Sequence, residues 1–118
     1  MTYISGFVVA VPTASKEAYR KMAATVAEVF KDYGATEIVE AWGTDVRDGK
    51  LTDFKRAVQA KEDETVVFSW IVWPDKATAD ACEAKMPQDD RMKPPAEMPF
   101  DGKRMIFGGF TPIVELGR

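Results

Sequence analysis

Residues 65–73 have the sequence TVVFSWIVW, and this run is the part of the chain that decides the fold. Apart from Thr65 and Ser69, every residue in it is apolar, and most are β-branched or aromatic. This composition predicts a β-strand. Both alternating sets of side chains are apolar, so we expect the strand to lie in the centre of a sheet that is covered on both faces.

Three further strands are expected around this one. Residues 3–11 (YISGFVVAV) form a second run that is apolar on both faces, and Pro12 ends it. Residues 36–46 and 104–114 are expected to form the other two strands. The last of these runs contains Gly108-Gly109, and glycine inside a strand indicates either a bulge or a close approach of another group.

Two helices are expected between the strands. Residues 15–33 carry apolar side chains at three- and four-residue steps, with Ser15 as the N-cap and Gly34 as the stop. A second, alanine-rich helix is expected to begin after Asp75 and to end at residue 85 or 86. Residues 53–61 are compatible with either a short helical turn or an edge segment.

The predicted order is β-α-β-β-α-β, which gives an α+β protein of the ferredoxin-like class with a four-stranded antiparallel sheet and both helices on one face. We expect one domain over residues 1–118, with a proline-rich irregular excursion at 87–103. The uncovered sheet face would be apolar, and a second copy is its simplest cover. The expected assembly is therefore a homodimer through the sheet face, a dimeric α/β barrel, although a tail or the excursion could cover part of that face.

Charge and composition exclude several classes of protein. The net charge is −3, with 16 basic and 19 acidic residues intermixed, so a nucleic-acid partner is not expected. No stretch approaches the ~20 apolar residues that span a bilayer, so no membrane association is expected. The single cysteine, Cys82, and the absence of a signal-peptide pattern at the start favour a cytoplasmic location.

The chain contains no histidine. This excludes Ser-His-Asp and Cys-His sites, histidine-ligated haem and the usual zinc sites. We expect no cofactor and no metal. Any catalysis would depend on carboxylates, Lys, Arg, Tyr, Ser, an oxygen-ligated metal or the substrate itself.

Strands 36–46 and 65–73 carry the first candidate site residues. Glu40 and Trp42 share one face of their strand, and a carboxylate beside an aromatic ring in a closed barrel could act as a general base. Glu40 could equally pair with a basic group at the dimer seam. Ser69 and Trp70 are candidate ligand contacts, although a satisfied buried hydroxyl and a packing aromatic would explain them as well.

The excursion at 87–103 supplies the second group of candidates. Long irregular segments in compact domains are often functional. Asp90, Arg91 and Arg104 could form a lid that grips an anionic ligand, because a guanidinium group holds a carboxylate with two hydrogen bonds. The alternative is a surface ion pair followed by a tight turn.

Four runs resemble the YbaA-like family of bacterial proteins: GFVV at 6–9, AWG at 41–43, KEDETVVFSWIVWP at 61–74 and MPFDGKRMIFGGF at 98–110. The resemblance covers nearly the whole chain. It implies a dimeric α/β-barrel fold in a cytoplasmic protein of unestablished biochemical role. It supplies no catalytic residues.

Three functions remain open from the sequence. The first is a small dimer that binds a small molecule between sheet and lid. The second is a cofactor-free enzyme, resembling monooxygenases or isomerases, that acts on a small aromatic or enolisable substrate. The third is a structural or protein-interaction role.

Overall fold

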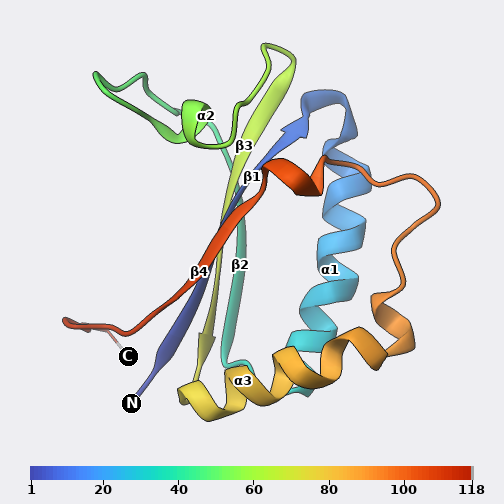
Figure 1. Cartoon of the computed structure of the whole chain (residues 1–118), viewed down its shortest axis with the longest axis vertical. Coiled ribbons are helices and arrows are strands. Elements are labelled where there is room, and N and C mark those ends of the chain that lie inside the picture. Colours follow the sequence, from blue (N-terminus) through green and yellow to red (C-terminus); the bar gives the residue numbers. More distant parts are fainter. Residues whose placement is uncertain (118) are drawn as a thin grey trace.

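The computed structural model describes residues 1–117 and contains one four-stranded sheet with helices against it (Figure 1). The elements are β1 (Tyr3–Pro12), α1 (Lys16–Asp32), β2 (Glu37–Trp42), α2 (Phe54–Ala57), β3 (Glu64–Trp73), α3 (Lys76–Lys85) and β4 (Ile106–Phe110). The order β-α-β-β-α-β is confirmed. The undecided segment at 53–61 contains the short helix α2.

The strands lie in the order β2-β3-β1-β4, and every neighbouring pair is antiparallel. The two central strands, β3 and β1, are the two runs predicted to be apolar on both faces. Their pairing extends from Tyr3 opposite Trp73 to Pro12 opposite Glu64. The ferredoxin-like α+β fold is therefore confirmed.

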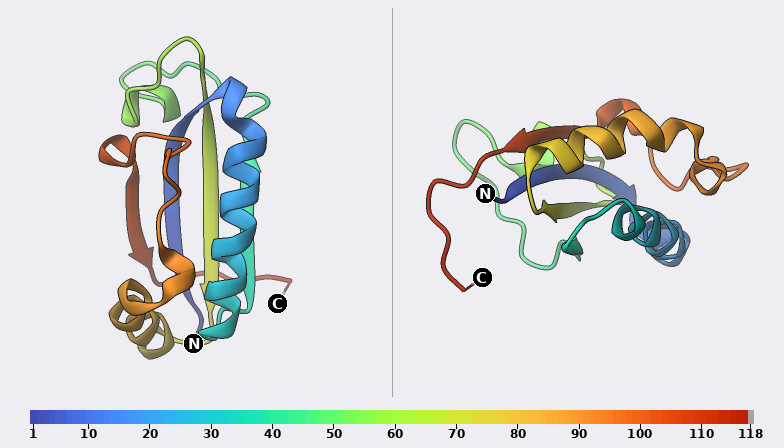
Figure 2. Two further views of the ribbon diagram at one scale, coloured as in Figure 1. Left: turned by 90° about the vertical axis from the view of Figure 1, so that its right-hand side faces the viewer. Right: turned by 90° about the horizontal axis from the view of Figure 1, so that it is seen from below.

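One face of the sheet packs against α1. Val9, Val11 and Val67 point to this side and pack against Tyr19 and Ala23 of the helix. Figure 2 shows that α1 runs along one half of this face, while α3 crosses one end of the sheet. The irregular segment after α3 runs beside α1 over the other half, so two different kinds of cover share this face.

The opposite face is covered at one end only. Val8 and Val66 point to this side, where they pack with Val58, just beyond α2. The covering segment is thus the connection between β2 and β3, which lies on the side of the sheet away from α1 in Figure 1.

The rest of this second face stays bare in the single chain, and we call it the open sheet face. It is formed by Phe68, Trp70, Ile106 and Phe110, whose register places them on the side opposite α1. Phe68 is 45% exposed and Phe110 is 59% exposed. The open sheet face is therefore a continuous apolar surface.

Local signals explain most helix ends. The Asp75 carboxylate accepts a hydrogen bond from the backbone N–H of Thr78 at 2.8 Å, as expected of an N-cap. Gly34 has a φ of +111°, the left-handed conformation that ends α1. Ser15 occupies its predicted N-cap position but its side chain makes no capping bond, because a 3-10 turn at Thr13–Ser15 leads into the helix.

Two strands are shorter than predicted. β2 ends at Trp42 instead of residue 46, and β4 spans Ile106–Phe110 instead of 104–114, after a 3-10 turn at Gly102–Arg104. Pairing is uninterrupted at Gly108 and Gly109, so β4 has no bulge there. Close approach is the correct alternative, because a β-carbon on Gly109 would collide with the Tyr3 ring.

Within residues 1–117, none of the helices combines the length and the apolar character that crossing a membrane requires.

Candidate functional site

A cavity of about 600 Å³ lies between α1, the helix-facing side of the sheet and the irregular segment after α3. We call this segment, residues 86–105, the strap. The cavity walls are mainly apolar. They include Phe7, Val9, Val26, Phe30, Ile71, Met92, Pro99, Phe100 and Met105.

Three polar side chains meet at the sheet side of this cavity. Glu40 comes from β2, Ser69 lies directly opposite it on β3, and Tyr19 comes from α1. The Tyr19 hydroxyl donates a hydrogen bond to Glu40 Oε1 at 2.7 Å. Ser69 is only 4% exposed. We call these three residues the polar cluster.

Burial raises the pKa of the Glu40 carboxyl, while hydrogen bonding from Tyr19 and Ser69 opposes that increase. Burial and the neighbouring Glu40 raise the pKa of the Tyr19 hydroxyl. None of the ion pairs found among residues 1–117 involves Glu40. The cluster therefore holds a carboxylate that is bound by neutral donors only.

Although burial raises its pKa, Glu40 is exposed when the whole residue is considered. Solvent reaches it because β2 lies at the edge of the sheet. A smaller hollow of about 250 Å³ lies on its other side, between α1 and β2. Trp42 lines this smaller hollow and not the large cavity, and Lys16 Nζ lies 5.4 Å from the centre of its ring. Glu40 thus lines both spaces.

Trp70 lies on the open sheet face, away from the cavity, and its indole N–H donates to Glu37 Oε2 at 2.9 Å. Trp73 faces the helices and is buried, with its indole N–H donating to Ser5 Oγ at 3.1 Å. The two tryptophans therefore point to opposite faces of the sheet. Trp70 is consequently placed where a partner, and not a cavity ligand, would meet it.

Arg91 ties the first end of the strap to α1. Its guanidinium group contacts the carboxylates of Asp89, at 2.9 Å, and Asp32. Arg91 holds the pKa of Asp89 well below its usual range, and the Tyr33 hydroxyl also donates to Asp89. Arg91 lines the cavity with its charge already paired, whereas the exposed Asp90 does not line it.

Arg104 ties the second end of the strap to β3. It donates to both carboxylate oxygens of Glu64 at 2.7 Å and to Asp101 at 3.1 Å. Its guanidinium group lowers the pKa of Glu64 to about 2. Asp90, Arg91 and Arg104 therefore do not converge on one point, and the two arginines hold the strap in place over the cavity.

Tyr19 is a site residue that the sequence pattern does not single out. It belongs to the apolar stripe of α1, and the 3.6-residue period does not reveal that its hydroxyl faces Glu40. Its ring also contacts Phe100 of the strap edge to face, with the ring centres 5.7 Å apart. Tyr19 therefore links the polar cluster to the strap.

A further cavity of about 380 Å³ lies below α3, with Phe30, Trp73 and Cys82 in its walls. Cys82 is buried, and burial raises the pKa of its thiol, which fits an inert packing residue. Across residues 1–117, no group of three or more His, Cys, Asp or Glu side chains is spaced to hold a metal ion.

The fold and the cavity define a ferredoxin-like α+β protein with a mainly apolar pocket beneath the strap. Residues 2–102 match the sequence profile of a family described as protein of unknown function (DUF1428), and the chain belongs to that family. The uncharacterized protein YbaA of Escherichia coli K12 is 59% identical over 116 residues, covering 98% of this chain and 99% of that protein. YbaA of Shigella flexneri matches to the same extent. The YbaA-like resemblance is confirmed.

Among solved structures, the chain is similar to a dimeric ferredoxin-like protein from an uncultured marine organism. The TM-score is 0.59 at 10% sequence identity, and the match covers 98% of each chain. At this identity the likeness concerns the fold.

Proposed function

We propose that this protein is a homodimer that binds a small, largely apolar molecule in the cavity beneath the strap. The observation that carries the proposal is the polar cluster, in which a carboxylate, a phenol and a hydroxyl meet within mainly apolar walls. Apolar cavities with a few convergent polar groups are the usual form of small-molecule sites.

The polar cluster limits the chemistry of the ligand. An ionised carboxylate only accepts hydrogen bonds, so Glu40 favours a ligand with a hydroxyl or an amine N–H. The surrounding Phe7, Ile71 and Phe100 favour a hydrocarbon or aromatic body. A phenol or an aromatic amine has both features, and the volume of about 600 Å³ is within the range for such molecules.

The open sheet face supports the homodimer. Phe68, Ile106 and Phe110 are each at least 45% exposed in the single chain, and Phe68 on β3 and Ile106 on β4 lie on either side of Val8 of β1. An exposed apolar patch of this kind usually marks an interface. A two-fold pairing of this face with itself would bury it in both copies at once, and the structural relative described above is a dimeric protein.

A second candidate function is cofactor-free catalysis with Glu40 as general base. The raised pKa of Glu40 favours it, because a base is most effective when its pKa approaches the working pH. Solvent access through the edge strand favours binding instead. The two functions differ in turnover, since an enolisable compound would exchange its acidic hydrogen with deuterated water faster than in buffer alone only if Glu40 abstracts it.

The binding proposal is tested by native mass spectrometry of protein purified without denaturation, followed by a panel of phenols and aromatic amines. We expect a dimer that retains or takes up one small molecule per chain. Val26→Trp places an indole in the cavity and should abolish uptake, whereas Glu28→Trp adds the same group to the exposed side of α1 and should not. A wild-type protein that takes up no member of the panel would contradict the proposal.

A further inference from the structure

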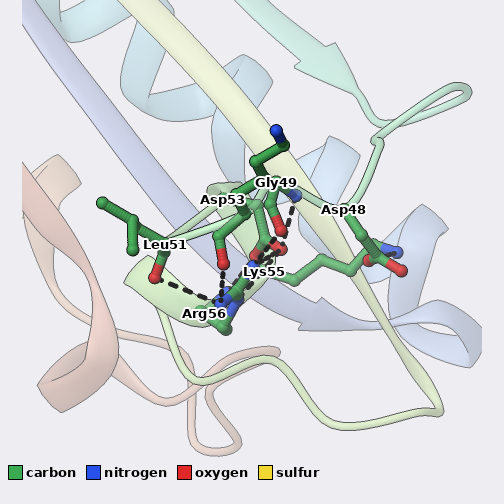
Figure 3. A network of polar contacts seen from close by, with 7 residues as sticks. Asp48, Gly49, Leu51, Asp53, Lys55 and Arg56 are labelled. Atoms are coloured by element: carbon green, nitrogen blue, oxygen red, sulfur yellow. Dashed lines mark hydrogen bonds and ion pairs between the residues drawn. The ribbon is translucent and has the colours of Figure 1, made fainter.

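The connection between β2 and β3 contains a loop, residues 47–53, that is held rigidly although it lies on the surface. Its organiser is Arg56 of α2, whose guanidinium group donates to the backbone carbonyls of Gly49, Lys50 and Leu51 (Figure 3). Arg56 also contacts the Asp53 carboxylate at 2.9 Å. Three successive carbonyls are thus fixed by one side chain.

Asp53 fixes the loop from the inside. Its carboxylate accepts hydrogen bonds from the backbone N–H groups of Arg56, at 2.8 Å, and Gly49, at 3.1 Å. The Asp53 side chain is only 6% exposed. The Arg56 guanidinium group and these two backbone N–H groups together lower the pKa of Asp53 to about 2. Gly49 is required for this packing, because a β-carbon there would collide with the carbonyl of Thr52.

This well-ordered loop exposes a large apolar side chain to solvent. Leu51 is 95% exposed, although its carbonyl is one of those that Arg56 holds. On α2, Phe54 is 49% exposed and its ring lies 5.9 Å from that of Phe68 on the open sheet face. The apolar surface therefore continues from the sheet onto α2, which directly follows the loop.

A second apolar segment lies on the same side of the sheet. After β4 the chain leaves on the side away from α1, at the end of the sheet opposite α2 (Figure 1). Three residues of this segment, Ile113, Val114 and Leu116, are 97%, 85% and 97% exposed, and Thr2 anchors it by donating to Glu115 at 2.7 Å. Loop and tail thus frame the open sheet face from its two ends.

We infer that the loop at 47–53 is an interface arm, built by Arg56 to place Leu51 against the second copy of this chain. This inference rests on the homodimer of the proposed function. A second copy is the occupant that fits best, because a partner sheet seated on the open sheet face would lie between loop and tail and meet both. Preorganisation by Arg56 lowers the entropy lost on binding.

The test compares dimer dissociation constants from analytical ultracentrifugation. Leu51→Asp should weaken the dimer at least about tenfold, since two leucines lose their burial in each dimer. Ala84→Asp, which adds the same charge to an exposed position on α3, should leave the constant unchanged. Arg56→Met should also weaken the dimer and speed hydrogen exchange at residues 49–53 without altering the apolar contact itself.

Phe68→Asp distinguishes the proposed role of the interface arm from the proposed dimer through the open sheet face. If Phe68→Asp gives folded monomers while Leu51→Asp dimerises as tightly as the wild type, the arm is refuted and the sheet-face dimer stands. If Arg56→Met loosens the loop and leaves the dissociation constant unchanged, the role given to Arg56 is wrong. A wild-type chain that is monomeric at high concentration would overturn the dimer and the arm together.

Discussion

Replacing Arg104 by methionine should destabilise the protein strongly, because it leaves the Glu64 carboxylate buried without its cation. The Glu64 side chain is 4% exposed and that of Arg104 is 16% exposed, and two hydrogen bonds of 2.7 Å join them. Removing one partner of a buried pair costs about 3–5 kcal/mol. We therefore expect Arg104→Met to lose about that much free energy of unfolding at pH 7.

The pH dependence identifies the cause. In the wild type the pKa of Glu64 is lowered to about 2, so its stabilising contribution is complete above the ordinary value of about 4.3 and disappears as the pH falls toward 2. In Arg104→Met, the guanidinium group that lowers the pKa of Glu64 most is absent, so this pKa is higher than in the wild type. The stability deficit of the variant should consequently shrink as the pH is lowered from 7 to 4.

Urea unfolding at a fixed protein concentration measures both effects, since dimer formation makes stability concentration-dependent. Arg104→Met/Glu64→Gln is the matched control, because it removes both charges and should recover part of the deficit. A deficit below about 1 kcal/mol at pH 7, the range of surface ion pairs, would refute the reasoning. So would a deficit that is the same at pH 4 and pH 7.

Three further predictions test single contacts. Glu40→Gln should weaken ligand uptake in titration calorimetry without lowering stability, because a carboxyl whose pKa is raised by burial is destabilising when ionised; a loss of stability with undiminished uptake would contradict the site. Cys82 should react with a thiol reagent only in denaturant, because it is 2% exposed and its thiol pKa is raised; rapid labelling of the native protein would show that α3 opens. Gly109→Ala should cost about 1–3 kcal/mol by forcing the Tyr3 ring to move; unchanged thermal unfolding would show that the ring moves freely.

The sheet and its central strands were predictable because they depend on local patterns. The two strands that are apolar on both faces, β1 and β3, are recognised from composition alone, and Asp75 and Gly34 mark helix ends by side-chain and backbone chemistry. The ends of β2 and β4 were less accessible. The end of β2 depends on where the loop to α2 leaves the sheet, and the start of β4 depends on the 3-10 turn before it. The alternation of apolar residues does not indicate either point.

The candidate site was predictable in part. Alternation along β2 places Glu40 on the helix-facing side, and antiparallel pairing with β3 brings Ser69 beside it. Tyr19 was missed as a polar partner because its ring belongs to the apolar stripe of α1, and the same side chain also donates a hydrogen bond to Glu40. The ion pairs of the two arginines were not predictable, because acidic partners such as Asp32 and Glu64 lie far away in the sequence.

The binding site is tested most directly by two-dimensional NMR of isotopically labelled protein during titration with the panel of phenols and aromatic amines. We predict saturable shifts at the amides of Tyr19, Ser69 and Phe100 for at least one compound, absent in Val26→Trp and weakened in Glu40→Gln. Saturable shifts confined to the open sheet face, or no saturable shift with any compound, would contradict a ligand site beneath the strap.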